Sequence, residues 1–273
     1  MSDAAPVGVI GGSGLYSLLD DAERLEVPTP YGAPSARITV GVLAGRRVAF
    51  LPRHGGGHTL APHRIPYRAN VWALASLGVR ALVTSSAVGG LVDEAAPGVF
   101  VVPDQYLDRT TNRDGTFYDG ARVEHLAAPD PFDPLLRDLA IDALTAEHVP
   151  VRPTGTTVVI DGPRFATRAE SRFHAASGGT TINMTLAPET PLALELGIAV
   201  VNCSFVTDRD SAVDAGHEDA VTAGLVLERL AAAQPVIRRV VAAVVERIPD
   251  GFRAGPAVPA DAIAEVLARP VRR

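Results

Sequence analysis

Residues 81–90 read Ala-Leu-Val-Thr-Ser-Ser-Ala-Val-Gly-Gly, an apolar start followed by hydroxyl side chains and then by two glycines. The start of this stretch, residues 81–85, predicts a buried strand of a sheet that helices cover on both faces. The small residues after it allow a ligand to lie against the backbone. A strand that ends in an ordinary glycine turn has the same pattern, so a binding site is one of two interpretations here.

Similar strand patterns alternate with helical patterns along the chain, and this alternation predicts an α/β fold. The predicted strands span residues 7–10, 46–51, 81–85, 99–103, 156–160, 181–183 and 198–206. The predicted helices span residues 67–77, 133–147, 168–176, 188–196 and about 218–248. Because no repeat or linker-like segment interrupts the pattern, we expect a single domain over residues 1–273. Residues from about 250 would form a C-terminal extension or arm.

The composition excludes several classes of function. The chain has 273 residues, 47% of them hydrophobic, and a formal net charge of -6. A net acidic protein is not expected to bind nucleic acid or an anionic membrane, which attract clustered positive charge. We find neither an apolar run long enough for a membrane span nor the pattern of a signal peptide. The single cysteine, Cys203, cannot form an internal disulfide, so we expect a cytoplasmic protein.

The chain contains no lysine, so all 25 basic side chains counted as lysine or arginine are arginines. This excludes Schiff-base chemistry, a cofactor attached to lysine and the lysine of a phosphate-binding P-loop. A bound anion would therefore have to be held by arginine, histidine, hydroxyl groups and backbone N–H groups.

Two glycine-rich loops follow predicted strands. The first, residues 11–15, places Ser13 among glycines, which suits an anion or an unliganded tight turn. The second places Arg53 and His54 before three glycines and His58, a natural phosphate clamp. The three glycines disfavour the helix that a zinc-binding histidine pair would need, so we predict no metal site.

Further polar or aromatic residues follow the later strands. Asp208 and Asp210 follow the most apolar strand. Because two nearby carboxylates repel each other, one pKa should rise, and a protonated carboxyl could then donate to a ring nitrogen. A helix cap or an Asp-x-Asp metal site would use the same residues. Phe165 could stack on a base, and Asn183 would be costly to bury without a partner.

Taken together and in this order, the segments resemble the purine nucleoside phosphorylase and methylthioadenosine phosphorylase family, most closely the methylthioadenosine branch. The resemblance runs from about residue 7 to about residue 230. It rests on Gly-Gly-Ser-Gly-Leu at 11–15, the Arg-His-Gly loop, Tyr-Arg-Ala-Asn at 67–70, Asp-Arg-Thr at 108–110, Gly-Pro-Arg-Phe at 162–165, Arg-Ala-Glu-Ser at 168–171, Asn-Met-Thr at 183–185 and Thr-Asp-Arg-Asp at 207–210.

The resemblance implies one α/β domain with a central twisted mixed β-sheet, flanked by helices and assembled as a homotrimer. It places phosphate at Ser13, Arg53, His54, Ser86, Ala87 and Thr185. It places the nucleoside at Phe165, Ile182, Asn183, Met184, Thr207, Val88, Gly89 and Val226, with His125 reaching a neighbouring subunit's site. Asp208 and Asp210 would be the catalytic pair that reads the base. Inorganic phosphate would be a co-substrate, and no cofactor or metal is implied.

The expected reaction is cleavage of a purine nucleoside by phosphate. Breaking the glycosidic bond develops positive charge on the sugar, which a bound phosphate stabilises before it captures C1′. Asp208 would protonate N7 of the leaving base. An amino group at position 6 of the purine can donate to Asp210, whereas an oxygen at that position would place two acceptors opposite each other. The amino group is therefore preferred. Ala166 stands where the 6-oxopurine branch carries glutamate, which also favours adenine.

The substituent at the 5′ position is expected to be methylthio, because Ala223, Leu225 and Val226 predict a small apolar pocket. Adenosine, a 6-oxopurine nucleoside or another 5′-modified nucleoside remain alternative substrates. Hydrolysis by water is an alternative reaction, and a non-catalytic nucleoside-binding protein is an alternative from another class.

Overall fold

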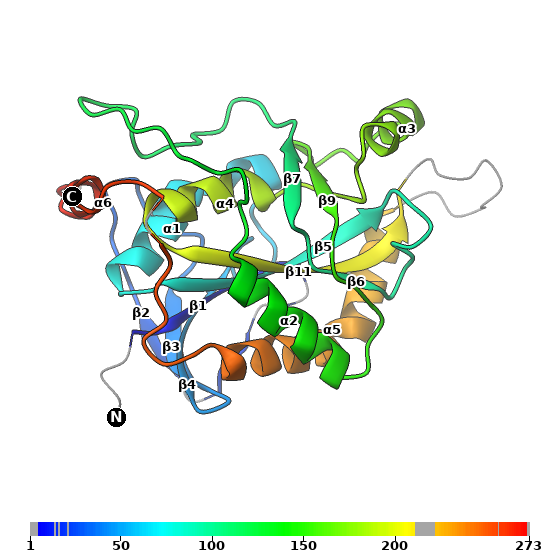
Figure 1. The fold of residues 1–273 in the computed structure, drawn as a ribbon, viewed down its shortest axis with the longest axis horizontal. Coiled ribbons are helices and arrows are strands. Elements are labelled where there is room, and N and C mark those ends of the chain that lie inside the picture. The colour runs from blue at the N-terminus through cyan, green and yellow to red at the C-terminus, as the bar shows by residue number, and fades with distance from the viewer. Residues whose placement is uncertain are drawn as a thin grey trace.

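The computed structural model describes residues 5–13, 15, 17–20, 22–210, 222–255 and 257–271. In this part of the chain, one mixed sheet of eleven strands is flanked by helices (Figure 1). The strands are β1 (Val7–Gly11), β2 (Glu23–Leu25), β3 (Ile38–Leu43), β4 (Arg46–Pro52), β5 (Ala81–Gly90), β6 (Phe100–Val101), β7 (Gln105–Asp108), β8 (Val151–Arg152), β9 (Thr156–Val159), β10 (Thr181–Asn183) and β11 (Ala199–Arg209). The helices are the short η1 (Pro62–Arg64), α1 (Tyr67–Ser76), α2 (Pro134–Ala146), α3 (Arg168–Ala176), α4 (Leu186–Glu195), α5 (Ala223–Arg247) and α6 (Ala260–Leu267). The predicted fold class, an α/β domain with a mixed sheet, is confirmed.

Strand β5 is the branch point of the sheet. It pairs in parallel with β1 over its first half and with β11 over its whole length. On the edge of β5 opposite β11, where β1 has ended, the last two residues, Gly89 and Gly90, pair with the antiparallel β10. The parallel strands β4, β1, β5 and β11 therefore lie side by side, β5 and β11 continue together beyond the end of β1, and β10 pairs with the end of β5.

The helices cover the sheet in two layers (Figure 1). Val7 and Val9 of β1 pack in one buried cluster with α2 and α5. Ile10, which points to the opposite face, packs in a second cluster with α1, α4 and α6. Successive strand residues face opposite sides, so a strand buried on both faces is apolar throughout. Each such side chain contributes about 1.5–3 kcal/mol on burial, and the result is a stiff support for the strand ends.

The start of α3 is fixed by a capping box. Thr167 accepts from the backbone N–H of Glu170 at 3.2 Å, and the Glu170 carboxylate accepts from the backbone N–H of Thr167 at 2.6 Å. These bonds satisfy two of the free N–H groups at the helix start. They fix the position of Ser171, which lies on the side of α3 facing β11 and Asp210.

Most predicted elements are present, and the differences have clear causes. Strands β5 and β11 extend beyond the predicted ends, because pairing with each other carries them through hydroxyl and charged residues. The sequence did not predict β2, β3, β7 and β8, which are short or lie away from the sheet centre. The predicted start of the last long helix, at about residue 218, lies outside the described residues.

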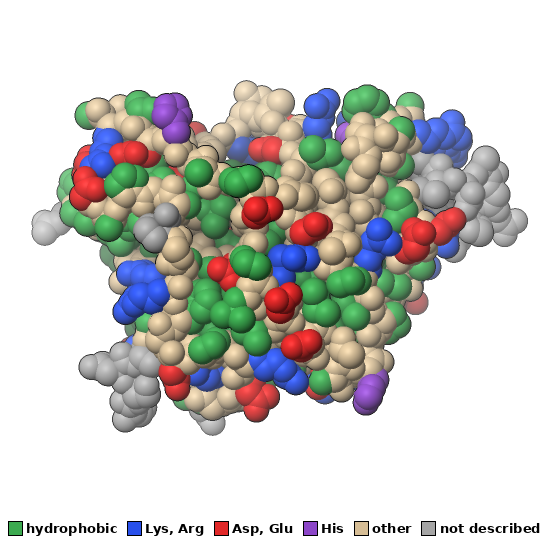
Figure 2. Space-filling view, viewed as in Figure 1, with side chains coloured by type: hydrophobic (Ala, Val, Ile, Leu, Met, Phe, Trp, Pro, Cys, Tyr) green, Lys and Arg blue, Asp and Glu red, His purple; other side chains and the backbone are tan. Residues whose placement is uncertain are grey.

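The segment after residue 250 ends in α6, which packs against α1. The indole N–H of Trp72 donates to the backbone oxygen of Val266 at 3.0 Å, and Ala262 is buried in the same cluster. On the face in Figure 2, basic and acidic side chains are interspersed over the surface. Of the helices in the described ranges, none combines the length and the hydropathy needed to cross a membrane.

Candidate active site

The candidate site is a cavity of about 300 Å³ where β1, β4, β5 and β11 end. In α/β sheets, ligands bind beyond the carboxyl ends of the strands. Apart from His125, the residues assigned to phosphate or nucleoside from the sequence all line this cavity. They are Ser13, Arg53, His54, Ser86, Ala87, Val88, Gly89, Phe165, Ile182, Asn183, Met184, Thr185, Thr207, Asp208, Asp210 and Val226.

Further residues complete the walls of the cavity: Gly12, His58, Pro62, Ile160, Pro163, Ala166, Ala223 and Leu227. Ala223 lines it as predicted, but the prediction for Leu225 was wrong, because Leu227 takes that place. On a helix, residues 223, 226 and 227 lie on one face, whereas residue 225 points elsewhere. Residues 211–217, which precede this wall in the chain, fall outside the described residues.

Arg53 lies just after β4, with its side chain only 1% exposed. Its Nε and Nη2 atoms donate to the two carboxylate oxygens of Glu189 at 2.7 and 2.8 Å, and Nη1 donates to the backbone oxygen of Ser85 at 2.9 Å. Burial alone would lower the pKa of Arg53, but the ion pair with Glu189 raises it on balance, so the group stays charged. Three of the five N–H groups are used in these bonds, which leaves one on each terminal nitrogen for a ligand.

The first glycine loop approaches Arg53 closely. A Cβ atom at Gly12 would lie 2.5 Å from the backbone oxygen of Ser85 and 2.8 Å from Nη1 of Arg53. Only glycine fits between them. The loop therefore brings its backbone next to the guanidinium at Gly12, and Ser13, the next residue, lines the same cavity as Arg53.

Two hydroxyl groups on the same wall are prepared to donate. The amide nitrogen of Asn202 donates to Ser86 Oγ at 3.1 Å, and Ser204 in turn donates to the oxygen of Asn202 at 2.6 Å. Because Ser86 accepts in this network, its own hydrogen can point at a ligand. Thr185 precedes α4 without making the side-chain bond of a helix cap, so its hydroxyl is also available in that role.

His54 is neutral and its tautomer is fixed. Burial lowers the pKa of His54 to about 4. Nδ1 lies 2.9 Å from the backbone oxygen of Leu60, which can only accept, so the ring hydrogen is on Nδ1 and Nε2 is an acceptor. The rings of His54 and His58 are stacked, with their centroids 4.3 Å apart.

The other end of the cavity holds two buried carboxyl groups. A bulge in β11 at Thr207 sets Asp208 opposite Gly89. Burial raises the pKa of Asp208 to about 6, and the charge of Asp210 adds to the increase. The hydrogen bond from Thr207 and the charge of Arg229 act in the opposite direction. The predicted rise of one pKa in this pair is confirmed, although burial contributes more to it than mutual repulsion.

A hydroxyl group lies beside each carboxyl group. Thr207 Oγ1 lies 2.6 Å from Asp208 Oδ2 and 3.3 Å from the backbone oxygen of Val88. Its single hydrogen can serve one of these acceptors at a time. If Asp208 is ionised, Thr207 donates to it; if Asp208 is protonated on Oδ2, Thr207 accepts from it and donates to Val88. Ser171 takes the same position at Asp210.

Gly89 gives the two carboxyl groups their common space. A Cβ atom there would lie 3.0 Å from Cβ of Asp210 and 3.2 Å from Oδ1 of Asp208. It would also lie 3.1 Å from Ile182, whose side chain lines the same part of the cavity. A side chain at position 89 would thus fill the space between the two acids.

Between the two ends, Asn183 is the last residue of β10 and Met184 follows it. The side-chain nitrogen of Asn183 is buried and has no hydrogen-bond partner among the described residues. A buried donor left unpaired costs about 1–3 kcal/mol, and a bound ligand that accepts a hydrogen bond from this group would remove that cost. Arg113 holds the backbone behind it by donating to the oxygens of Met184 at 3.0 Å and Ala187 at 2.7 Å.

His125 lies away from the cavity and is exposed. It belongs to the long segment between β7 and α2, part of which projects from the body of the molecule (Figure 1). Its predicted contact is with another subunit, so this chain alone does not bring it to the site.

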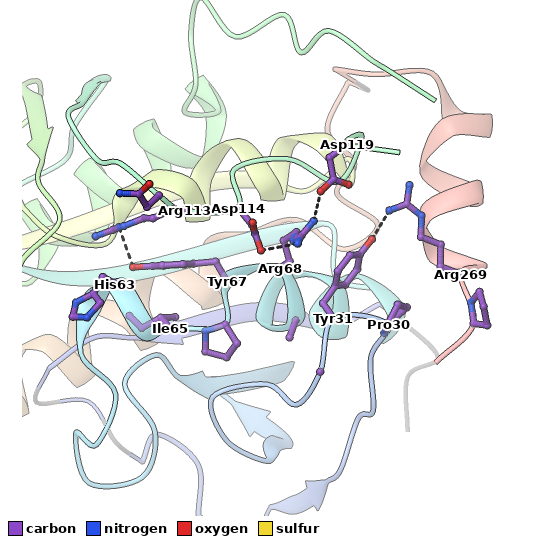
Figure 3. Close-up of a pocket in the computed structure, with 15 residues that line it drawn as sticks. Pro30, Tyr31, His63, Ile65, Tyr67, Arg68, Arg113, Asp114, Asp119 and Arg269 are labelled. Carbon is purple, nitrogen blue, oxygen red and sulfur yellow. Dashed lines mark hydrogen bonds and ion pairs between the residues drawn. The ribbon is translucent and has the colours of Figure 1, made fainter. Parts of the chain in front are cut away.

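A second, larger cavity of about 850 Å³ is lined by Tyr31, Tyr67, Arg68, Arg113 and Arg269, among other residues (Figure 3). Figure 3 shows Arg68 bridging Asp114 and Asp119, Tyr31 bonded to Arg269, and Tyr67 bonded to Arg113. Arg113 lines this cavity while bonding to Met184, so one side chain connects the walls of both cavities.

The sequence did not point to Glu189, Asn202 or Ser171 as part of the site. Each acts behind a residue that lines the cavity, respectively Arg53, Ser86 and Asp210. The described ranges contain no group of three or more histidine, cysteine or acidic side chains placed to hold a metal ion.

Comparison with known proteins places this site in a family. The model of the phosphorylase superfamily matches residues 6–246. The chain belongs to this family, whose characterised members here are nucleoside phosphorylases, transferases of pentosyl groups.

Comparison with individual relatives shows which members of the family this chain resembles. An S-methyl-5′-thioadenosine phosphorylase of Nitrosopumilus maritimus is 43% identical over 91% of this chain and 94% of its own. A purine nucleoside phosphorylase of Streptomyces coelicolor is 48% identical over 78% of this chain and 79% of its own. The structure of methylthioadenosine phosphorylase from Schistosoma mansoni in complex with adenine superposes with a TM-score of 0.83, at 34% identity over 88% of this chain and 91% of that one.

Proposed function

We propose that this protein cleaves S-methyl-5′-thioadenosine with inorganic phosphate to give adenine and 5-methylthioribose 1-phosphate. The main support is the spacing of the two ends of the cavity along β5. Ser86, at the anion end, and Gly89, at the acid end, are three residues apart, about 10 Å at 3.3 Å per residue. This spacing suits a phosphate at one end and a purine base at the other, with a sugar between them.

The reaction follows from what each end offers. Arg53, Ser13, Ser86 and Thr185 hold a phosphate with N–H and O–H donors, and His54 offers an acceptor for a phosphate hydroxyl. As the bond from C1′ to the base nitrogen breaks, positive charge develops on the sugar, and the phosphate stabilises it before bonding to C1′. Its oxygen replaces the base without any added oxidant or metal.

The departing base needs a proton, and Asp208 is placed to supply it. A carboxyl group with a pKa of about 6 carries a proton part of the time near neutral pH. Asp208 then donates to N7 of adenine, while Asp210 accepts from the amino group at position 6. A 6-oxopurine would oppose two acceptors at Asp210, which is why we place adenine ahead of hypoxanthine.

The wall beside the base agrees with this choice. Phe165 offers a flat apolar surface, and Ala166 presents no carboxylate to the other edge of the purine. At the far wall, Ala223, Val226 and Leu227 of α5 are apolar, which suits a methylthio group better than a hydroxyl. Because the Streptomyces coelicolor relative is a purine nucleoside phosphorylase, adenosine and other purine nucleosides are the second candidate substrates.

We further infer that the enzyme is a cytoplasmic homotrimer that needs no cofactor. The trimer would bring His125 of one subunit to the open side of another subunit's cavity. The exposed position of His125, in the long segment between β7 and α2, supports this arrangement. The chain would act as a single domain, with residues from about 250 as an arm.

The test is base release from methylthioadenosine, adenosine and inosine, each with and without phosphate. We expect adenine release that requires phosphate and is fastest with methylthioadenosine. Equal release without phosphate would replace the proposal with hydrolysis. Faster cleavage of inosine would overturn the choice of base. Tight binding without turnover of any substrate would identify a nucleoside-binding protein instead.

A further inference from the structure

Arg113 joins two backbone segments that line the active-site cavity. Its Nη1 atom donates to the backbone oxygens of Met184 at 3.0 Å and Ala187 at 2.7 Å, around the start of α4. Its Nη2 atom donates to those of Ile160 at 3.4 Å and Asp161 at 2.9 Å, directly after β9. Each of these nitrogens carries two hydrogens, so four hydrogens match four backbone oxygens. One guanidinium, on a side chain that is only 4% exposed, thereby ties the two segments together.

The backbone oxygens of Met184 and Ala187 need an outside donor for a reason that the sequence contains. In an α-helix, the oxygen of one residue accepts from the N–H group four residues further along. The residues at those positions are Pro188 and Pro191, and proline has no N–H group. Ala187 also has φ -108° and ψ 136°, which is not a helical conformation. Arg113 supplies the two donors that the prolines lack.

Neighbouring side chains hold the guanidinium of Arg113 in place. Its Cζ atom lies 5.5 Å from the centre of the Tyr67 ring, and Nη1 lies 3.3 Å from the Tyr67 hydroxyl. Its Nε atom lies 3.4 Å from Oδ1 of Asp161, which provides a counter-charge. The planar fork of the guanidinium is thus directed at the backbone of both segments.

The two segments that Arg113 joins also touch each other. Gly162 has φ +63°, and a Cβ atom there would lie 2.3 Å from Sδ of Met184. The turn after β9 therefore packs directly against the Met184 side chain. Both segments contribute to the wall of the active-site cavity, the first with Pro163 and Phe165 and the second with Met184 and Thr185. Their relative position decides the shape of the space that a nucleoside occupies.

We propose that Arg113 is a positioning residue for the nucleoside, because it sets these two segments relative to each other. This inference rests on the proposed function, since it deals with the same nucleoside subsite. Arg113 lines the larger cavity and not the active-site cavity, so it acts through the backbone (Figure 3). The peptide between Met184 and Thr185 is planar, so a bond to the Met184 oxygen also fixes the direction of the Thr185 N–H group.

The first variant to measure is Arg113→Ala. We expect the KM for methylthioadenosine to rise about tenfold and kcat to stay within about threefold, because the lost interaction orients the nucleoside before and during the reaction. The KM for phosphate should change by less than about threefold, because Glu189 and not Arg113 holds Arg53. Thermal denaturation shows whether the variant is folded.

Chemical rescue distinguishes the planar fork from the charge alone. Arg113→Ala leaves a space beside the larger cavity, which a small cation can enter. Millimolar guanidinium should lower the raised KM, because it presents the same fork, whereas methylammonium at equal concentration should not. Arg113→Lys keeps the charge with three hydrogens on one nitrogen, too few for four oxygens. Its KM should therefore stay high, and it carries the test if Arg113→Ala does not fold.

The matched control is Arg137→Ala. Arg137, on α2, also joins two backbone segments, because it donates to the oxygens of Pro103 at 3.1 Å and Pro153 at 2.7 Å. It lines neither cavity. Its loss should lower the thermal stability but leave the KM for methylthioadenosine unchanged.

Binding of methylthioadenosine without phosphate, measured by calorimetry, keeps this inference separate from the proposed function. If the unmodified protein binds the nucleoside but does not cleave it with phosphate, the proposed function fails, and the dissociation constants of the variants still decide the role of Arg113. Weaker binding in both Arg113 variants but not in Arg137→Ala supports the inference. Unchanged binding and KM in folded Arg113→Ala would overturn it, and so would equal rescue by methylammonium.

Discussion

The two ends of the cavity hold charge in opposite ways. At the anion end, the guanidinium of Arg53 is locked by two bonds to the carboxylate of Glu189, an ion pair that is almost completely buried. At the base end, the two carboxyl groups are paired with the hydroxyls of Thr207 and Ser171, which are neutral. One end has a fixed charge, and the other has a charge that a proton can cancel.

This difference corresponds to what each part of the substrate does. Phosphate is an anion before the reaction and stays one after it, so a permanent cation suits it throughout. The base gains a proton as it leaves, so its partner has to give one up. A hydroxyl can both donate and accept, and it therefore fits a carboxyl group in either state.

The largest expected effect comes from removing the movable proton. Asp208→Asn keeps the shape of the side chain, but an amide does not transfer a proton to N7. We expect kcat for adenine nucleosides to fall by about 10²–10⁴-fold, with little change in phosphate KM. Steady-state kinetics with both substrates varied measure the two effects separately.

The control for this change is Asp93→Asn. Asp93 is a carboxylate that is 77% exposed and pairs with Arg209, the residue between the two acids. It should leave kcat unchanged. If Asp208→Asn retained full activity, the proton donor would have to be another group.

The next effect concerns the fixed charge. Glu189→Ala leaves Arg53 buried without its partner, which costs about 3–5 kcal/mol of stability. Urea denaturation should show this loss, and adding phosphate should restore more stability to the variant than to the original protein, since the anion becomes the partner of Arg53.

Glu26→Ala is the control, because Glu26 and Arg37 form an ion pair on the surface and such pairs contribute about 0–1 kcal/mol. Equal losses in the two variants would mean that the buried pair has no special role at the anion end.

The smallest expected effect is a shift in pH dependence. With the pKa of Asp208 at about 6, the acid is protonated below that pH and ionised above it. Since the proton donor is active in its protonated form, kcat/KM should fall as the pH rises through this value. The charge of Arg229 lowers the pKa of Asp208, so Arg229→Met should move the fall to higher pH by a fraction of a unit.

Arg239→Met serves as the control in the pH–rate profile. Arg239 lies further along α5 and pairs with Glu147 at the surface, so its loss should not move the profile. A shift to lower pH in Arg229→Met would contradict the assignment of the proton donor.

The sequence predicts the residues that line the cavity well, but it predicts the residues that hold them in place poorly. Ser13, Arg53 and Asp208 follow apolar strands in the chain, and strand ends in an α/β sheet are where ligands bind. Local sequence is enough to find such residues, because the change from apolar to polar or glycine residues marks each strand end.

The supporting residues lack such a mark. Glu189 stands 136 residues from Arg53 in the chain, and an acidic residue in the first turn of a helix is ordinary. Ser171 belongs to the Arg-Ala-Glu-Ser motif at 168–171, but nothing in that motif indicates its contact with Asp210, 39 residues away in the chain. Only Asn202 left a signal, as an amide inside the apolar strand β11, which a buried network had to satisfy.

Two oxygen atoms, one on Asp208 and one on the backbone of Val88, can accept from the Thr207 hydroxyl, and this choice has a consequence for the direction of the reaction. In the proposed mechanism, a protonated Asp208 faces a bare N7 before cleavage, and an ionised Asp208 faces an N7 that carries hydrogen afterwards. A proton that is transferred to N7 has to lie on Oδ1, because Oδ2 lies against Thr207, and the Thr207 hydroxyl can turn from the Val88 oxygen to Oδ2 as Asp208 becomes ionised. A catalyst does not change the equilibrium between the two sides, so the site sets no preferred direction of its own. Whether nucleoside is consumed or rebuilt is then decided by how fast the surrounding metabolism removes the free base and the sugar phosphate.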